Sequence, residues 1–254
     1  MTRIIDLSVP FENNATEPTP PVIEHWDHAN GAMRMAKLAG VRASDFPDSL
    51  ALASEKIVGY AHTGTHVDSP YHYGPLCEGK PARTIDQVPL EWCYGDGVVL
   101  DMRHKEPGAE ITVDDLKAAL GKINYTLRPM DIVLLQTGCD KYWGTDLETY
   151  LSMQSGLGVK GTKWLLDQGI RCIGIDAWTL DRPPKAMAAA FRESGDRDEL
   201  WASHMYGRKH EYLQIEKLAQ LDQLPSFGFK VAAFPTKFAN SSAGWTRAVA
   251  IIEE

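Results

Sequence analysis

The sequence predicts an α/β fold of the mixed α+β type, in which helices flank a mixed β-sheet. Short apolar segments of strand length recur along the 254 residues and alternate with a few helix-like segments. No internal repeat, low-complexity tract or Gly/Ser-rich linker divides the chain. We therefore expect a single domain over residues 1–254.

Six segments have the composition of strands. The first, residues 3–9, alternates apolar and polar side chains and ends at Pro10. The other five contain short apolar runs, and they cover residues 95–102, 131–136, 170–176, 229–234 and 246–252.

Two segments predict helices. Thr112 stands where an N-cap is expected, and Asp115 three residues later forms a variant of the capping box. An apolar stripe follows and ends at Gly121, which is typical of a helix terminus. The second helix-like segment covers residues 161–169.

The segment between the first strand and residue 61 is irregular. Residues 17–21 are proline-rich and predict an extended crossing, because a residue that precedes proline is excluded from the α region. Residues 22–54 lack clear periodicity and predict a loop with a short helix. This excursion either forms one wall of a pocket or is a surface insertion.

Composition excludes several classes of protein. A formal charge of −8 argues against non-specific nucleic-acid binding, which requires a basic face. The N-terminus lacks the apolar region of a signal peptide, and no apolar run approaches the ~18 residues of a membrane span. We therefore expect a cytoplasmic protein with no membrane partner. Its four cysteines are far apart and form no CxxC pair, which indicates reduced thiols: Cys77, Cys93, Cys139 and Cys172.

Residues 61–73 are the most informative stretch, because they hold three of the eight histidines and one carboxylate. A regular helix fails, since Asp68 would lie about 240° around the axis from His62. One straight strand from His62 to His72 also fails, because it would span about 33 Å, too far for ligands of one ion. The motif must fold back as a tight turn, for which Gly64 and Pro70 are suited.

The residue types of this motif point to a metal site. Two imidazoles and one carboxylate, from His62, His66 and Asp68, suit Zn²⁺, Mn²⁺ or Fe²⁺ and leave a position open for water. Such an ion would supply hydroxide near neutral pH. The second oxygen of Asp68 could bridge another ion. His72, beyond the proline, is placed to act as a general acid or base. An isolated histidine would more often be only a hydrogen-bonding residue, so the clustering carries the interpretation.

The run from His62 to His72 resembles the HxGTHxDxPxH signature of the cyclase-like metal hydrolases, the family of bacterial kynurenine formamidase and isatin hydrolase. The resemblance implies a swivelling β/β/α fold, one or two Mn²⁺ or Zn²⁺ ions, and hydrolysis of an amide C–N bond. It also implies a homodimer or homotetramer. The family carries a histidine and a glutamate near its metal centre at the separation of His204 and Glu216, so we expect these two side chains to act there. His210 and Glu211 are a rival pair.

Further residues are candidates for binding a small-molecule substrate. Asp176 ends a predicted strand, and with Trp178 and Arg182 it would lie at the rim of the sheet. A helix N-cap or a turn acid is the alternative role for Asp176. A polar turn before the last strand could hold a carboxylate on its backbone amides; it contains Ser241, Ser242, Gly244, Trp245 and Arg247. Kynurenine formamidases of this family place a substrate-contacting tryptophan early in the chain. Here the corresponding region is residues 17–21, which departs from that pattern, and Trp26 is the first tryptophan and the candidate contact.

These observations predict a metal-dependent amidohydrolase. The irregular excursion is longer than kynurenine formamidases have, which favours an isatin-hydrolase-like enzyme acting on a cyclic amide. An aryl formamide, imide or lactone substrate stays open, as does a metal-dependent cyclase or isomerase. A structural metal site in a non-enzyme is the remaining alternative, although such sites usually hold four Cys or His ligands.

Overall fold

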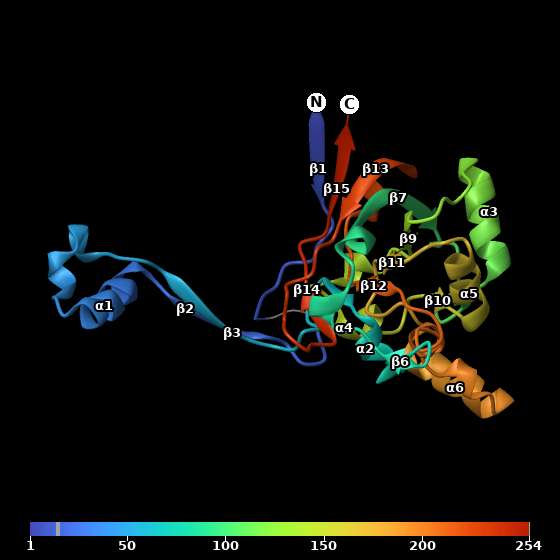
Figure 1. Ribbon diagram of the computed structural model, residues 1–254, viewed down its shortest axis with the longest axis horizontal. Coiled ribbons are helices and arrows are strands. Elements are labelled where there is room, and N and C mark those ends of the chain that lie inside the picture. Colours follow the sequence, from blue (N-terminus) through green and yellow to red (C-terminus); the bar gives the residue numbers. More distant parts are fainter. Residues whose placement is uncertain (14–15, 254) are drawn as a thin grey trace.

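The computed structural model describes residues 1–13 and 16–253, in which nine strands form one mixed sheet (Figure 1). The order across the sheet is β1-β15-β13-β7-β9-β11-β12-β4-β14. The strands are β1 (Thr2–Asp6), β4 (His66–Asp68), β7 (Tyr94–Asp101), β9 (Ile132–Gln136), β11 (Cys172–Ile175), β12 (Leu213–Glu216), β13 (Phe227–Ala232), β14 (Ala243–Trp245) and β15 (Val249–Glu253).

The centre of this sheet is parallel and its flanks are antiparallel. β7, β9, β11 and β12 run parallel to one another. β13, β15 and β1 continue one flank with antiparallel pairings, and β4 and β14 continue the other. The predicted mixed α/β fold is therefore confirmed.

Each of the six predicted strands has a counterpart, with shifted ends. The first strand ends at Asp6 rather than Val9, and the last begins at Val249 because residues 246–248 are not in the ladder. β4, β12 and β14, which are three or four residues long, were not predicted.

The core lies on both faces of the sheet. Along β9, Val133 and Leu135 face one hydrophobic cluster, and Ile132 and Leu134 face the other. This alternation explains why the parallel strands are continuous apolar runs. Helices α3 (Val113–Ile123) and α5 (Val159–Asp167) contribute their apolar stripes to the first cluster.

The predicted capping box of α3 is confirmed. The Thr112 hydroxyl accepts from the Asp115 amide at 3.2 Å, and the Asp115 carboxylate accepts from the Thr112 amide at 2.8 Å. The predicted end was wrong, because the helix continues past Gly121 and is closed by Asn124, whose φ is 50°. Asparagine can adopt the left-handed conformation that glycine usually provides.

The remaining elements surround the sheet, and except for the 11-residue α6 they are short. The helices are α2 (Pro70–Tyr73), α4 (Leu147–Tyr150), α6 (Pro184–Ser194) and α7 (Ala202–Tyr206). Two small ladders pair β5 (Leu76–Cys77) with β6 (Lys80–Pro81) and β8 (Glu110–Ile111) with β10 (Gly156–Leu157). Single 3₁₀ turns cover Ala43–Asp45, Pro47–Ser49, Ile85–Gln87, Leu90–Cys93, Asp140–Tyr142, Arg197–Glu199 and Leu221–Gln223.

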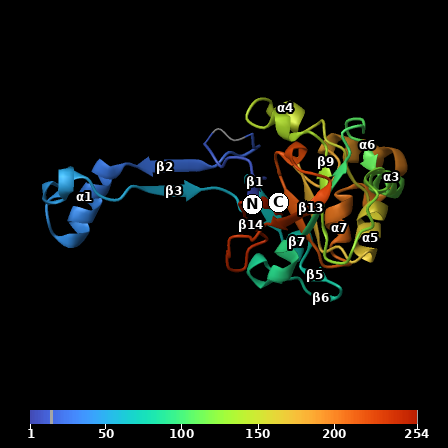
Figure 2. The same ribbon diagram turned by 90° about the horizontal axis from the view of Figure 1, so that it is seen from above.

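The irregular excursion forms an arm, which we define as residues 22–58. β2 (Val22–Trp26) and β3 (Ser54–Val58) pair as an antiparallel ladder, and α1 (His28–Ala39) lies at its far end. Figures 1 and 2 show the arm standing clear of the body. The idea that it walls a pocket of its own chain was therefore wrong.

Two smaller observations concern the whole chain. All four cysteines are buried and free, as predicted. Within residues 1–13 and 16–253, no helix combines the length and the apolar character needed to cross a bilayer.

Candidate metal centre

The histidine-rich motif is built from a turn, a strand and a short helix. Gly64 lies in the turn with φ of 63°, a left-handed conformation that suits glycine. His66 and Asp68 then belong to β4, and His72 lies in α2. The rejection of one straight strand from His62 to His72 was correct, since strand β4 covers His66–Asp68 and the run then turns into α2.

Strand register brings Glu216 to the motif. His66 and Asp68 are two residues apart on β4, so their side chains lie on the same face. β12 pairs with β4 in antiparallel register, and this sets Glu216 opposite His66 and Gln214 opposite Asp68. Cross-strand neighbours of this kind are close enough to share one ligand.

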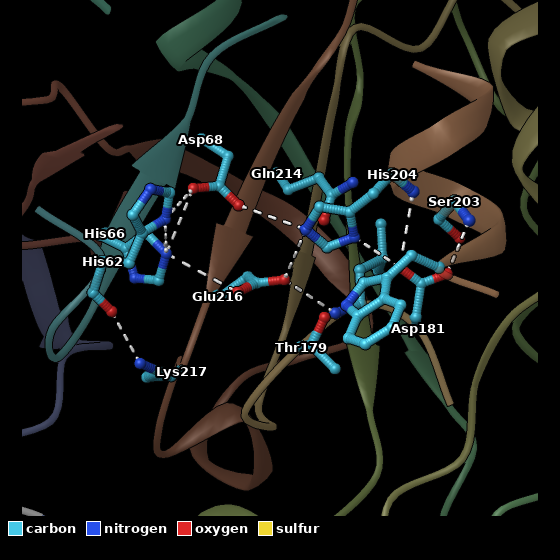
Figure 3. A network of polar contacts seen from close by, with 12 residues as sticks. His62, His66, Asp68, Thr179, Asp181, Ser203, His204, Gln214, Glu216 and Lys217 are labelled. Carbon is cyan, nitrogen blue, oxygen red and sulfur yellow. Dashed lines mark hydrogen bonds and ion pairs between the residues drawn. The ribbon is translucent and has the colours of Figure 1, made fainter. Parts of the chain in front are cut away.

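The side-chain atoms converge on a small volume (Figure 3). His62 Nδ1 lies 2.8 Å from Asp68 Oδ1, and His66 Nε2 lies 3.3 Å from the same oxygen. His66 Nε2 is also 3.6 Å from Glu216 Oε2. His62, Asp68 and His72 form one group whose ligand atoms could hold a cation, and His66, Asp68 and Glu216 form another.

The Asp68 carboxylate fits a cation. It is fully buried, and in the described part of the chain neither of its oxygens accepts a well-directed hydrogen bond. Burial opposes its ionisation, but the neighbouring histidines, His72 foremost, outweigh burial and hold the pKa of Asp68 well below its ordinary value. Gln214 Oε1 is a further buried oxygen without a hydrogen bond. A buried oxygen without a hydrogen bond lowers the stability of the fold unless another group interacts with it. A bound cation would provide that interaction.

The orientation of His66 also suits ligation. Its Nδ1 lies 2.8 Å from the Gly64 carbonyl, so Nδ1 carries the proton and Nε2 presents a lone pair. His62 Nε2 lies 2.9 Å from the Ser242 hydroxyl, which steadies the ring. Burial lowers the pKa of His62, but Asp68 outweighs this effect and the pKa is raised.

His204 is held by a carboxylate that the sequence did not indicate. Its Nδ1 forms a short contact with the buried Asp181, whose other oxygen accepts the Ser203 amide at 2.6 Å. Nε2 is thereby directed to the site, 3.7 Å from both Asp68 and Glu216. Burial lowers the pKa of His204, but Asp181 outweighs it and raises the pKa well above the usual range. Carboxylate–histidine pairs of this kind are typical supports of metal ligands.

His72 lies at the open side of the site. Its ring is 4.1 Å from that of His62 and 5.2 Å from that of His204, centroid to centroid. Burial, opposed by Asp68, lowers the pKa of His72 to about 4. The imidazole is therefore neutral near pH 7.

A buried ion pair supports the turn that contains His62 and Gly64. Lys217 Nζ lies 2.6 Å from Glu17 Oε1 and donates to the His62 carbonyl at 2.7 Å. The same Glu17 oxygen accepts the Gly64 amide at 2.8 Å. We call this pair the Glu17–Lys217 latch, because it ties the histidine turn to the end of β12.

A cavity of about 220 Å³ opens onto these residues. This volume is below the roughly 300–1,000 Å³ of pockets for drug-sized ligands, so it suits a compact molecule. Besides the histidines, Glu216 and Lys217, its lining includes Trp178, Thr179 and Trp201. Trp201 has φ of 49°, a conformation that is unusual for a large side chain and that occurs here at the pocket mouth.

Most of the residues predicted to contact substrate lie away from the cavity. Trp26 is on the arm, under the guanidinium of Arg34. The Asp176 carboxylate accepts hydrogen bonds from the Thr137 and Gly138 amides, so it acts as the turn acid that was the alternative. Trp245 donates its indole N–H to a backbone carbonyl and packs against Phe11. Of the predicted set, only Trp178 lines the cavity, while Ser242 contacts His62.

The rival pair lies away from the cavity, whereas the polar turn contacts the metal motif through Ser242. His210 lies 3.8 Å from Glu78, and Glu211 pairs with Arg83, away from the cavity. Arg182 pairs with Glu199. The polar turn includes edge strand β14, which pairs with β4, and the Ser241 and Thr246 amides on either side of it donate to backbone carbonyls.

Comparison with known proteins gives a family match. Residues 5–182 match the model of a family described as "Putative cyclase". Kynurenine formamidase of Erythrobacter litoralis is 27% identical over 190 residues, which cover 74% of this chain and 72% of that protein.

Solved structures share the fold over the whole chain. Isatin hydrolase A from Ralstonia solanacearum superposes with a TM-score of 0.77 at 21% identity, covering 99% of this chain and 92% of that one. A predicted metal-dependent hydrolase from Bacillus stearothermophilus superposes with a TM-score of 0.66 at 17% identity, and both chains are fully covered.

Proposed function

This chain belongs to the cyclase family, and from that premise we propose that it is a metal-dependent hydrolase that opens the amide C–N bond of a small cyclic amide. The observation that carries the proposal is the buried, unsatisfied Asp68 carboxylate among His62, His66 and Glu216, at the base of a cavity. These four side chains would hold one divalent cation, Mn²⁺ or Zn²⁺. When bound, such an ion lowers the pKa of water and polarises a carbonyl group.

Residues of the chain would provide proton transfer, a hydrogen-bond donor and substrate contacts. His72 lines the cavity as a neutral imidazole, so it can accept a proton from the attacking water and return it to the leaving nitrogen. His204, fixed through Asp181, keeps a positive hydrogen-bond donor beside the two carboxylates. Trp178 and Trp201 offer aromatic surface to a flat substrate.

An aryl formamide is the second candidate substrate. The sequence relative named above is a kynurenine formamidase, which supports this reading. The similarity to isatin hydrolase A, which extends over nearly the whole of both chains, supports the cyclic amide. The two candidates share the bond that is broken and differ in whether one product or two are released.

The experiment compares both substrates on one preparation. Metal content is measured on protein purified without added metal, and turnover of isatin and N-formylkynurenine is followed before and after chelation. We expect about one or two ions per chain, and loss of turnover on chelation. Asp68→Asn should lose metal. His72→Asn should retain the ion held by His66, Asp68 and Glu216 and should lose turnover by about 10²–10⁴-fold. His210→Asn is the matched control, because that histidine lies outside the cavity.

Two results would count against the proposal. Protein that binds no divalent metal would refute the metal centre. Protein that binds metal but whose turnover is unaffected by His72→Asn would refute the proton-transfer role.

A further inference from the structure

A second hollow adjoins the metal cavity. Its volume is about 420 Å³, whereas the metal cavity has about 220 Å³. Trp201 lines both spaces, so its side chain lies at their common boundary. A substrate larger than a compact molecule would extend beyond the metal cavity. The second hollow is a space into which such a substrate could extend.

Positive side chains surround the second hollow, which we call the cationic pocket. The described residues that line it include three cations, Arg197, Arg208 and Lys209, and one carboxylate, Asp198. Within residues 1–13 and 16–253, none of the three cations has a carboxylate oxygen within 4.0 Å of its side-chain nitrogens. The chain as a whole has a formal charge of −8, so this pocket is a local exception. Its charge favours an anionic ligand.

Arg208 lies between the two short helices that carry histidines of the metal site. A Cβ atom on Gly74 would lie 2.8 Å from Arg208 Nε and 3.2 Å from its Cγ, so the arginine packs against the chain directly after α2, the helix of His72. Its Nη1 lies 4.0 Å from Met205 Sδ on α7, the helix of His204. Contacts with both helices restrict where this exposed guanidinium can lie.

The backbone of Trp201 has an unusual conformation. Its φ of 49° and ψ of 50° are left-handed, and its amide lies 3.1 Å from Met187 Sδ. Non-glycine residues in this region are enriched at ligand sites, where the surrounding structure holds them in place. The conformation keeps the indole at the boundary of the metal cavity and the cationic pocket.

We propose that the cationic pocket binds a carboxylate group on the substrate, so that the substrate is a cyclic amide with an acidic substituent. This inference rests on the proposed function. The amide ring would lie in the metal cavity, and the substituent would pass the Trp201 indole to reach Arg197 and Arg208. Arginine suits this role because it can bind a carboxylate through two parallel hydrogen bonds. The carboxylate formed by ring opening is a different group, since it arises at the carbonyl carbon of the amide.

The first experiment measures the binding of oxindole by isothermal titration calorimetry. Oxindole is a cyclic amide that resists hydrolysis, and it is compared with its 5-, 6- and 7-carboxylates and with the matching methyl derivatives. At least one carboxylate should bind about fivefold or more tightly than its methyl counterpart, because one unit charge at ~4 Å contributes about that factor even in water. Raising the salt concentration to ~1 M should reduce this advantage.

Variants assign the advantage to the cationic pocket. Arg197→Gln combined with Arg208→Gln should remove it, while circular dichroism stays that of a folded protein. Arg128→Gln is the matched control and should retain it, because Arg128 is also exposed but lines a different hollow. The proposal is overturned if no carboxylate binds more tightly than its methyl counterpart, or if the double variant keeps the advantage.

A displacement titration tests whether one molecule occupies both spaces. Oxindole should displace the bound carboxylate, since both would place the amide ring in the metal cavity. Independent binding of the two would show a separate anion site and would overturn the proposal. These readouts need no turnover. A protein that prefers the carboxylate but does not hydrolyse isatin would contradict the proposed function alone, and one that hydrolyses isatin without this preference would contradict the cationic pocket alone.

Discussion

Breaking the Glu17–Lys217 latch tests whether this buried pair holds the metal turn. Lys217→Met keeps the length of the side chain but removes its charge, and Glu17→Gln keeps the shape of the carboxylate. Each single change leaves one buried charge without its partner, since both side chains are at most 5% exposed. The His62 carbonyl then loses a donor, or the Gly64 amide retains only a neutral acceptor.

The expected loss of stability follows from the geometry of the ion pair. At 2.6 Å and an effective dielectric constant of ~20, the attraction is roughly 6 kcal/mol, and desolvation of the two ions opposes it by several kcal/mol each. The pair therefore adds little net stability, but removing one partner should lower the free energy of unfolding by about 3–5 kcal/mol. Glu17→Gln combined with Lys217→Met should cost no more than either single change, because no charge is left unpaired.

Urea unfolding followed by circular dichroism measures these costs. Lys230→Met is the matched control, because Lys230 lies 2.7 Å from Asp96 in a pair whose side chains are 44% and 50% exposed. This exposed pair should cost about 1 kcal/mol or less. Metal affinity of Lys217→Met should also fall, since His62 loses its backbone support. The reasoning is refuted if Lys217→Met costs no more than Lys230→Met, or if the double variant costs the sum of the singles.

Two further predictions concern single carboxylates. Asp181→Asn removes the charge that holds His204, so metal affinity or turnover should fall by about 10–100-fold while the fold stays intact. Chelator competition measures the metal affinity, and kcat measures the turnover. A change below about threefold in both would contradict this prediction. Asp115→Asn should cost about 1 kcal/mol at pH 7 through the N-cap of α3. Burial opposes the charge of Asp115, but Lys105 and the Thr112 amide outweigh burial and lower its pKa to about 2. Because the folded-state pKa is depressed, this stability is present above pH 3.8 and is lost as the pH falls toward 2, so unfolding midpoints of the two proteins should converge there.

The sequence by itself determined those features that depend on residues close together along the chain. Apolar runs specified the central strands β7, β9 and β11, because a strand buried on both faces must be apolar along its length. The Thr112 cap specified the start of α3, since capping joins residues only three apart. The metal motif was visible for the same reason: His62, His66 and Asp68 are close in sequence as well as in space.

Tertiary structure decided everything that joins distant residues. Glu216 reaches His66 only because β12 pairs with β4, and Lys217 meets Glu17 across 200 positions. No spacing rule encodes such contacts, and the resemblance to a known family identified Glu216 without explaining its position. The arm is a second part of the fold that local sequence patterns did not predict. Residues 22–54 were predicted as a loop with a short helix, but β2 and β3 pair there and α1 is 12 residues long, because the pairing of two strands about 30 residues apart is a tertiary contact.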